Sequence, residues 1–148
     1  MILLINKKAK FDYEISKTYL AGIALSGAEV KSLRNKSGSL KGSFVKIIGH
    51  EAFLINAQIT PYKFADNRDY DPKRTRKLLL NKKEIYQLIG FSDQKNWAIV
   101  PLSIELIGNR IKLKLGVGKG RKQFEKREVI KKRDEKRKLA KIVKQQYR

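Results

Sequence analysis

Three aspartates gather in one short segment, and they are the first residues in the sequence that could support catalysis. Asp66, Asp69 and Asp71 could together hold a divalent cation, as a metal-dependent nuclease requires. Cationic side chains such as Arg68 and Lys73 lie among them, however, so ion pairing and capping within the loop is the simpler interpretation. We therefore predict no metal site and no enzymatic activity, with a nuclease as the alternative.

Two other patterns could serve chemistry but are better interpreted as structural. His50 is the only histidine, and it falls in the expected loop of a hairpin, where a solvated turn residue is the simplest assignment. Glycines surround Lys119 as they would in a phosphate-binding loop, but the P-loop spacing is absent. We interpret Gly116, Gly118 and Gly120 as a flexible joint, and we predict no cofactor.

Clustered cations point instead to nucleic acid. The segment 73–77 carries four Lys or Arg and leads directly into three leucines, which would fix the charges in space. Anchored arginines can bind phosphates bidentately, although a solvated face remains the alternative. Near the N-terminus, cations are interleaved with aromatic residues that could stack on unpaired RNA bases or pack in the core: Lys7, Lys8, Lys10, Phe11 and Tyr13.

The charge balance extends this interpretation to the whole chain of 148 residues, whose net charge is +21. The last thirty residues contain fourteen Lys or Arg and four Asp or Glu, which is a local net charge of +10. A segment this polar cannot bury enough surface to offset its ordering entropy, so we expect it to be disordered when free. Residues 1–118 are also basic, and both parts suit a polyanion such as nucleic acid.

A membrane surface is the competing polyanion, and we do not expect one as a partner. The apolar residues of the tail do not form one continuous helical face, which an interfacial helix needs. The apolar residues 1–5 are too few for a signal sequence. The absence of cysteine excludes disulfides and thiolate chemistry and fits a cytoplasmic setting.

Alternation with a period of two residues is the main structural signal. In the segment 110–117 it predicts one apolar face and one cationic face, the latter formed by Arg110, Lys112 and Lys114. Segment 98–106 alternates likewise and should form a hairpin with it. A second hairpin is expected from 43–49 and 52–59, with Phe53, Ile55, Ala57 and Ile59 on one face, and shorter strands at 12–16 and 20–26.

Capping boxes predict the starts of two short helices, one at Ser26 with Glu29 and the other at Asn81 with Glu84. Segment 62–76 lacks periodicity and is expected to be a long loop. Together these signals predict a mainly β fold: a small OB-type antiparallel β-barrel of about six strands, with two or three short helices. Neither helix suits a DNA major groove, so RNA is the favoured ligand.

Four blocks of the sequence resemble the small protein B (SmpB) family, whose members are the protein partners of transfer-messenger RNA (tmRNA) in bacterial ribosome rescue. The blocks occur in family order and span nearly the whole chain: residues 6–9, 21–34, 71–80 and 118–127. The resemblance implies that a barrel of residues 1–118 grips the tRNA-like domain of tmRNA in place of an anticodon arm. It also implies that the tail, 119–148, enters the decoding centre and empty mRNA channel of a stalled ribosome and becomes helical there.

The resemblance also carries over individual positions. The tmRNA-facing residues are Lys7, Lys8, Tyr13, Arg74, Arg76, Leu79 and Lys112, to which the sequence pattern adds Phe11 and Lys114. The ribosome-facing residues of the tail are Lys119, Arg121, Lys122, Phe124, Lys126 and Arg127, to which the run of charge adds Lys131, Lys132 and Arg133. A tail helix over 121–147 would be about 40 Å long at roughly 1.5 Å per residue.

The sequence departs from the family at a few positions. Phe11 stands where His is frequent, and Leu20 stands where Glu is usual, so a polar RNA contact at Leu20 is not expected. Phe124 and Glu125 replace a Tyr or His followed by Asp, which keeps an aromatic plane but removes its hydrogen bond. We expect a non-enzymatic adaptor that is a monomer when free. The alternative is a ribosomal or initiation-type protein that binds rRNA without tmRNA.

Overall fold

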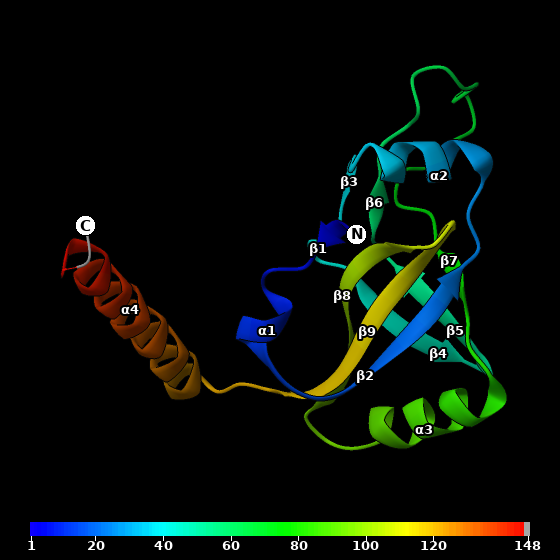
Figure 1. The fold of residues 1–148 in the computed structure, drawn as a ribbon. Coiled ribbons are helices and arrows are strands. Elements are labelled where there is room, and N and C mark those ends of the chain that lie inside the picture. Colours follow the sequence, from blue (N-terminus) through cyan, green and yellow to red (C-terminus); the bar gives the residue numbers. More distant parts are fainter. Residues whose placement is uncertain (147–148) are drawn as a thin grey trace.

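The computed structural model describes residues 1–146, and it describes the side chains of residues 1–122 and 125–141 (Figure 1). The strands are β1 (Ile2–Ile5), β2 (Tyr13–Ile23), β3 (Gly38–Ser39), β4 (Phe44–Ile48), β5 (Glu51–Ile55), β6 (Gln58–Ile59), β7 (Arg76–Leu79), β8 (Trp97–Ile107) and β9 (Arg110–Gly120). The helices are α1 (Ala9–Asp12), α2 (Gly27–Arg34), α3 (Lys82–Ser92) and α4 (Gln123–Gln146). Helices α2 and α3 lie at opposite ends of the main sheet.

The main sheet is antiparallel and has seven strands in the order β1-β8-β9-β2-β7-β5-β4, while β3 and β6 form a separate pair. This confirms the predicted mainly β fold class. The predicted barrel of about six strands is corrected in two respects: the described residues form seven strands in the main sheet and two in the second, and the main sheet is not closed because β1 and β4 are its edges. Strand β4 approaches β8 without pairing to it, and a pocket of about 530 Å³ lies between them.

The hairpin of β8 and β9 forms the centre of the core, and the predicted alternation holds along β9. In β8 the predicted face is divided at the irregularity between Pro101 and Ser103, so that Ile104 joins the main core while Val100 and Leu102 pack in a separate small cluster. Leu113, Leu115 and Val117 are fully buried on the inner face of β9, and Ile111 is nearly so. Lys114 on the other face is exposed, and Lys112 is half-buried. The predicted cationic face therefore exists, and packing of the opposite face holds it rigid.

Both predicted capping boxes are present. The Ser26 hydroxyl accepts a hydrogen bond from the Glu29 amide at 3.2 Å, and the Glu29 carboxylate accepts one from the Ser26 amide at 2.9 Å. Asn81 and Glu84 make the equivalent pair at the start of α3. These contacts satisfy amides that the first turn of each helix leaves without partners.

The second predicted hairpin is only partly right. Strands β4 and β5 pair as expected, but Ala52 and Leu54 face the core, and Phe53 and Ile55 are half-buried on the other side. The alternation changes phase at Asn56, whose φ is +64°, and the chain then continues as β6 in the second sheet. A single residue with positive φ breaks the strand, and an unbroken period of two cannot reveal it.

The glycines near Lys119 do not form a joint, which corrects the interpretation made from the sequence. Gly116 and Gly118 are buried in β9, which continues through Gly120. A Cβ atom on Gly118 would lie 2.3 Å from the Glu14 carbonyl oxygen, so glycine allows the close approach of β2. The glycines thus serve strand packing, and the connection to the tail comes after Gly120.

The tail forms helix α4, which lies within the range 121–147 over which a helix was predicted for the tail on the ribosome, and Tyr147 lies outside the described residues. The disorder expected of the free tail stays a prediction. The helix extends away from the sheet and meets the rest of the protein near α1 (Figure 1). Its first turns are held by Asp12, whose carbonyl accepts from the Arg121 amide at 2.8 Å and whose carboxylate pairs with Lys126 at 3.3 Å. Within the described residues, no helix has both the length and the apolar character to cross a membrane.

Candidate nucleic-acid interface

The outer face of β7, β2 and β9 brings two predicted RNA-facing residues together. Gly22 pairs with Leu79 of β7 on one side and with Lys112 of β9 on the other. A pocket of about 300 Å³ is lined by Gly22, Leu79 and Lys112, and also by Arg110 of β9 and Val30 of α2. Leu79 is 56% exposed beside it. An apolar side chain and a cation thus flank a small hollow, which can receive the edge of a base and its phosphate.

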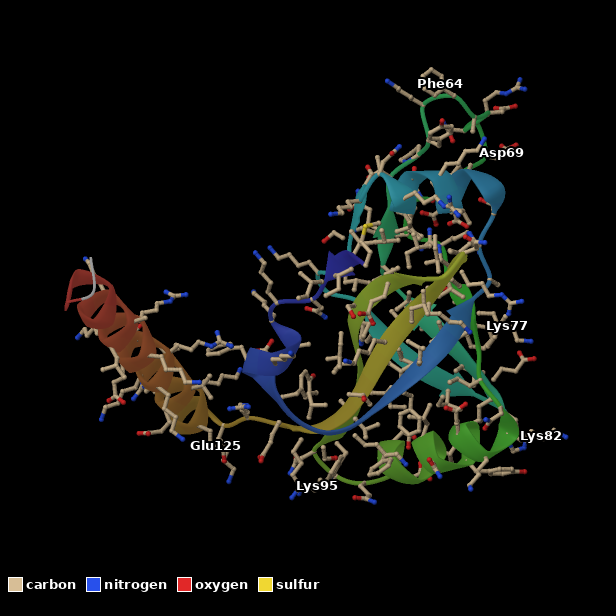
Figure 2. The ribbon with its side chains drawn as sticks, viewed as in Figure 1. Phe64, Asp69, Lys77, Lys82, Lys95 and Glu125 are labelled. Carbon is tan, nitrogen blue, oxygen red and sulfur yellow. The ribbon has the colours of Figure 1, made fainter. Side chains whose placement is uncertain are left out.

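The same face continues to a second group of cations. Lys114 pairs with Leu20 of β2 and with Ser103 of β8, and Leu20 is 44% exposed there. Beyond β8, a pocket of about 360 Å³ is lined by four cations and one carboxylate, namely Lys7, Lys10, Lys114, Arg133 and Glu105. Figure 2 shows nitrogen-tipped side chains along α4 and around α1. The N-terminal lysines, β9 and the tail therefore contribute to one positively charged surface.

The two aromatic residues predicted to face RNA, Phe11 and Tyr13, are both half-buried. Tyr13 is half-buried and packs against the small apolar cluster of Ala9, Val100 and Leu102. Phe11 is also half-buried, and the Lys126 ammonium lies 5.8 Å from its ring centre. In this arrangement Phe11 contacts a cation of the tail, so a base that stacked on Phe11 would compete with Lys126.

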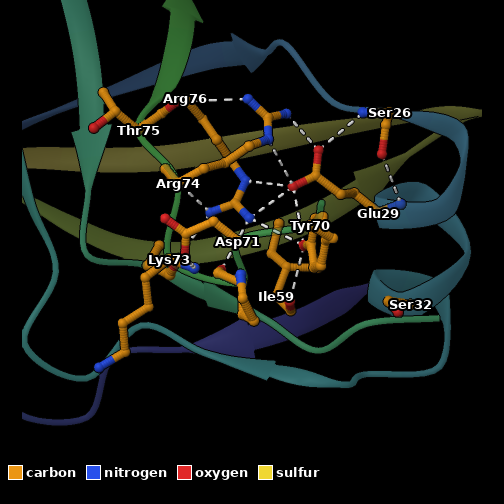
Figure 3. Close-up of polar contacts among 12 residues, drawn as sticks. Ser26, Glu29, Ser32, Ile59, Tyr70, Asp71, Lys73, Arg74, Thr75 and Arg76 are labelled. Carbon is orange, nitrogen blue, oxygen red and sulfur yellow. Dashed lines mark hydrogen bonds and ion pairs between the residues drawn. The ribbon is translucent and has the colours of Figure 1, made fainter. Parts of the chain in front are cut away.

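A buried ionic cluster lies behind this face, between α2, the loop 60–75 and β7 (Figure 3). The Arg76 side chain is 0% exposed. Its guanidinium donates to the Glu29 carboxylate at 2.7 Å and to the Ala57 carbonyl at 2.8 Å. Further bonds reach the Pro72 carbonyl and the Tyr70 hydroxyl. Each nitrogen of Arg76 is therefore bonded inside the protein.

Arg74 and Tyr70 complete the ionic cluster. The Arg74 guanidinium forms a short ion pair with Glu29 and donates to the Ala24 carbonyl at 3.2 Å, while its side chain keeps 37% exposure. The Tyr70 hydroxyl donates to the Ile59 carbonyl at 2.9 Å. The cluster thus ties the end of β2, the start of α2 and the loop 60–75 to β7, and so it fixes Leu79 beside Gly22.

This geometry corrects the assignment of Arg76. A fully buried guanidinium whose nitrogens are all bonded cannot contact RNA, so Arg76 positions the interface without belonging to it. The physical reason is Glu29, which is 1% exposed and needs cationic partners to remain ionised. Arg74 is partly exposed and can still present its outer edge to phosphate.

The surroundings of Glu29 control its pKa. Burial by itself raises the pKa of Glu29, but hydrogen bonds from Arg74, the Ser26 amide and Arg76 outweigh burial and lower it to about 2. The carboxylate is therefore charged throughout the physiological range. Burial also raises the pKa of Tyr70, and the nearby Glu29 charge raises it further.

The shifted pKa of Glu29 predicts a specific loss of stability in acid. The folded protein binds a proton at Glu29 only near pH 2, whereas the unfolded chain does so near the ordinary glutamate pKa. Stability is therefore complete above that ordinary value and falls as the pH drops toward 2, by on the order of 3 kcal/mol. Urea unfolding at several pH values will measure this. The Glu29→Gln variant should lose that part of the pH dependence, and the control Asp66→Asn should retain it.

The acidic loop residues are engaged locally, as predicted. Asp66 pairs with Arg68 at 2.8 Å, and hydrogen bonds from Arg68 lower the pKa of this exposed carboxyl. The Asp71 carboxylate accepts from the Lys73 amide at 2.9 Å. In the described part of the chain, no three His, Cys, Asp or Glu side chains gather in a metal-binding arrangement. The loop carboxylates therefore shape the loop and do not converge on one point.

The predicted ribosome-facing residues of the tail are placed along β9 and α4. Lys119 is exposed at the end of β9, and its ammonium lies 5.9 Å from the Trp97 ring centre. Arg121 is half-buried in the connection, where its Nε atom has no hydrogen-bond partner. The backbone of Phe124 lies in α4, but its side chain is outside the described set. The other predicted ribosome-facing residues that are exposed are Lys122, Arg127, Lys131, Lys132 and Arg133.

A family model described as SmpB protein matches residues 3–145. The chain belongs to the SmpB family. It is 46% identical over 138 residues to the SsrA-binding protein of Bacillus subtilis (strain 168), which covers 93% of this chain and 88% of that protein. It is also 46% identical over 143 residues to the SsrA-binding protein of Persephonella marina (strain DSM 14350 / EX-H1), which covers 97% of this chain and 94% of that protein.

The fold agrees with a solved structure described as "tmRNA-SmpB: a journey to the center of the bacterial ribosome". The TM-score is 0.68 at 43% sequence identity, and the match covers 80% of this chain and 84% of that one. Membership of the SmpB family confirms the resemblance that was drawn from the four sequence blocks.

The sequence did not reveal every residue that builds this SmpB-family surface. Glu29 appeared only as a capping residue, although its carboxylate also holds two arginines. Tyr70 and Gly22 were not singled out. The signal for Gly22 was available, since a glycine inside a long strand often marks the close approach of a ligand or another backbone. Tyr70 lies in the irregular loop, where no periodicity could assign it to the interior.

Proposed function

We propose that this protein binds tmRNA and admits it to stalled ribosomes in bacterial trans-translation. The similarity to SsrA-binding proteins over more than nine-tenths of the chain carries this proposal, since SsrA RNA is tmRNA. The cationic outer face of the sheet supports it independently. The protein acts as an adaptor without catalytic activity, in the cytoplasm, and is a monomer before it binds RNA.

The body of the protein binds the tRNA-like domain of tmRNA and stands where a tRNA would have its anticodon arm. The hollow at Gly22 lies between Leu79 and Lys112, and the strands on both sides hold it in shape. RNA helices present a wide, shallow minor groove and a regular phosphate backbone, which a rigid face with spaced cations can recognise by shape. Lys7, Lys8 and Lys114 extend the cationic surface along the backbone, and Arg74 contributes its exposed edge.

The tail binds in the decoding centre and in the empty mRNA channel of the stalled ribosome. Helix α4 has 24 residues, so it is about 36 Å long at roughly 1.5 Å per residue. The described side chains from 131 to 141 are all exposed, and most are cationic, so the helix suits a channel with RNA on all sides. Bound mRNA would occupy the same space, and the tail therefore distinguishes an empty channel from a filled one.

The test is a titration of the protein against tmRNA, a generic tRNA and empty ribosomes at several salt concentrations. We expect the tightest binding to tmRNA at every salt concentration. In the Lys112→Gln variant, tmRNA affinity should fall roughly tenfold, the value of one charge-assisted contact of about 1.5 kcal/mol. The slope of log affinity against log salt should become shallower by about 0.9.

Lys46→Gln is the matched control, because Lys46 is an exposed lysine on β4, at the opposite edge of the sheet. Its affinity and salt slope should remain those of the unaltered protein. Equal binding of tmRNA and generic tRNA would argue against the proposed function. Binding to ribosomes that is tighter than binding to tmRNA would favour a ribosomal or initiation-type protein instead.

A further inference from the structure

The loop 60–75 projects beyond α2, at the end of the sheet opposite α3 (Figure 1). Phe64 lies at its tip, as Figure 2 shows, and is 76% exposed, the most exposed of the large hydrophobic residues described. Burial of an aromatic side chain of this size is usually favourable in free energy. Its exposure at the end of a projecting loop therefore indicates a contact with a binding partner.

Aromatic rings and cations alternate at this tip. The Tyr62 and Phe64 rings meet edge to face, with centres 5.5 Å apart and planes at 69°. The Lys63 ammonium lies 4.9 Å from the centre of the Phe64 ring, and the Lys31 ammonium of α2 lies 5.5 Å from the centre of the Tyr62 ring. We call these four residues the aromatic tip. Lys63 lies over the Phe64 ring as Lys126 lies over Phe11, but Phe64 is 76% exposed whereas Phe11 is half-buried, so most of the Phe64 surface stays open to a base.

The aromatic tip is held in place by hydrogen bonds. The Asn67 side-chain amide donates to the Tyr62 carbonyl at 2.8 Å and to the Ala65 carbonyl at 3.1 Å, which closes the turn that carries Phe64. At the base of the loop, the Ser32 hydroxyl donates to the Thr60 carbonyl at 2.6 Å. The other side of the base is held by Tyr70 in the ionic cluster. The Phe64 ring is therefore presented on a framework that is already ordered.

The charges around the aromatic tip favour a base over a phosphate as its contact. Lys31 and Lys63 are cationic, but Asp66 offsets Arg68 through their ion pair, and Asp69 lies on the descending side of the loop. A bidentate grip on a phosphate would need an arginine without a competing ion pair. An exposed ring flanked by lysines instead matches the stacking platforms that bind unpaired bases, where nearby cations attract the strand and the ring holds the base.

We propose that the aromatic tip is a second RNA-binding surface, on which an unpaired base stacks against Phe64. This inference rests on the proposed function for the identity of the RNA, which is either tmRNA or small-subunit rRNA. The aromatic tip lies beyond α2, whereas the hollow at Gly22 lies on the sheet, so the two surfaces engage separate parts of the RNA. Stacking at this tip adds affinity without reading sequence.

The experiment compares the full-length protein with its Phe64→Ala variant in two separate titrations, one against tmRNA and one against empty ribosomes. We expect affinity to fall roughly 5- to 150-fold in one of the two titrations, the range observed for one aromatic–base stack. The salt slope should not change, because stacking releases no counterions. The titration that shows the loss identifies which RNA supplies the base.

Two variants make the result specific. Phe64→Leu keeps an apolar side chain without an aromatic plane and should bind as weakly as Phe64→Ala; full affinity in Phe64→Leu would indicate an apolar contact and overturn stacking. Tyr86→Ala removes another exposed aromatic side chain, on α3, and should bind normally. Unchanged affinity of Phe64→Ala in both titrations would overturn the second surface. If the unaltered protein showed no preference for tmRNA, the proposed function would fail on its own.

Discussion

Replacing Arg76 with alanine should destabilise the protein by about 3 kcal/mol or more, because it leaves a buried carboxylate with one partner fewer. Arg76 and Glu29 are both 0% exposed in their side chains, and Arg76 also satisfies the carbonyls of Ala57 and Pro72. The loss should appear as a lower urea midpoint and a lower melting temperature. Arg68→Ala is the matched control, since its ion pair with Asp66 is exposed, and it should unfold as the unaltered protein does.

A second variant separates this positioning role from direct contact with RNA. Arg76→Lys keeps the charge but loses the planar fork that serves several acceptors at once, so we expect it to fold with reduced stability. Below its melting temperature it should bind tmRNA with an unchanged salt slope, because a buried side chain releases no counterions. A slope that is shallower by about 0.9 would show that Arg76 reaches a phosphate and would contradict its burial.

A chain ending at Gly120 should still bind tmRNA but should not support tagging of nascent chains on stalled ribosomes. The cut belongs after Gly120 because the last residues of β9 pair with the start of β2: Ile15 with Gly118, Glu14 with Lys119 and Tyr13 with Gly120. With these pairs intact, the outer face and its hollow keep their shape. We expect affinity for tmRNA within a few-fold of the full chain, and no tagged product in a reconstituted translation assay.

A chain ending at Val117 is the informative comparison. It removes the same tail and also three residue pairs with β2 and two with β8, so it should melt at a lower temperature than the chain ending at Gly120. If the chain ending at Gly120 were folded but failed to bind tmRNA, the division of labour between body and tail would be wrong. If it supported tagging, the tail would not be needed to enter the ribosome.

The regular elements of the fold could be predicted from the sequence because their signals are local. The β8–β9 hairpin follows from the alternation along β9 and the turn at Gly108 and Asn109, and each capping box fixes the start of a helix within one turn. Strand β2 was predicted as two short pieces, because its bulge near Ser16 interrupts the alternation that a sequence shows. Whether the sheet closes into a barrel depends on the approach of β4 to β8. These strands are far apart in the sequence, so no local pattern determines it.

The sequence predicted which residue types form the candidate site, but it did not predict which of their side chains are buried. Lys114 is exposed and Lys112 is half-buried on the outer face that the alternation of 110–117 predicted, whereas the alternation predicted nothing about the exposure of Leu79. Arg74 and Arg76 have the same parity and the same chemistry, yet one is partly exposed and the other is enclosed. Both arginines pair with Glu29, a residue more than forty positions away in the sequence, but only Arg76 also donates to the carbonyls of Ala57 and Pro72 inside the protein. Such contacts between distant segments decide whether an arginine is enclosed, and no local pattern shows them.

The contact between Lys126 and Asp12 has a mechanical consequence. It fixes the start of α4 at one point beside α1, while the described remainder of the helix extends away from the sheet. A change in the orientation of α4 relative to the sheet would therefore be a rotation about the contact with Asp12. The helix continues for 20 residues beyond Lys126, about 30 Å at roughly 1.5 Å per residue, so a tilt of about 10° at this contact moves the far end by about 5 Å, close to one helical turn. A small rearrangement at α1 can thus redirect the whole tail.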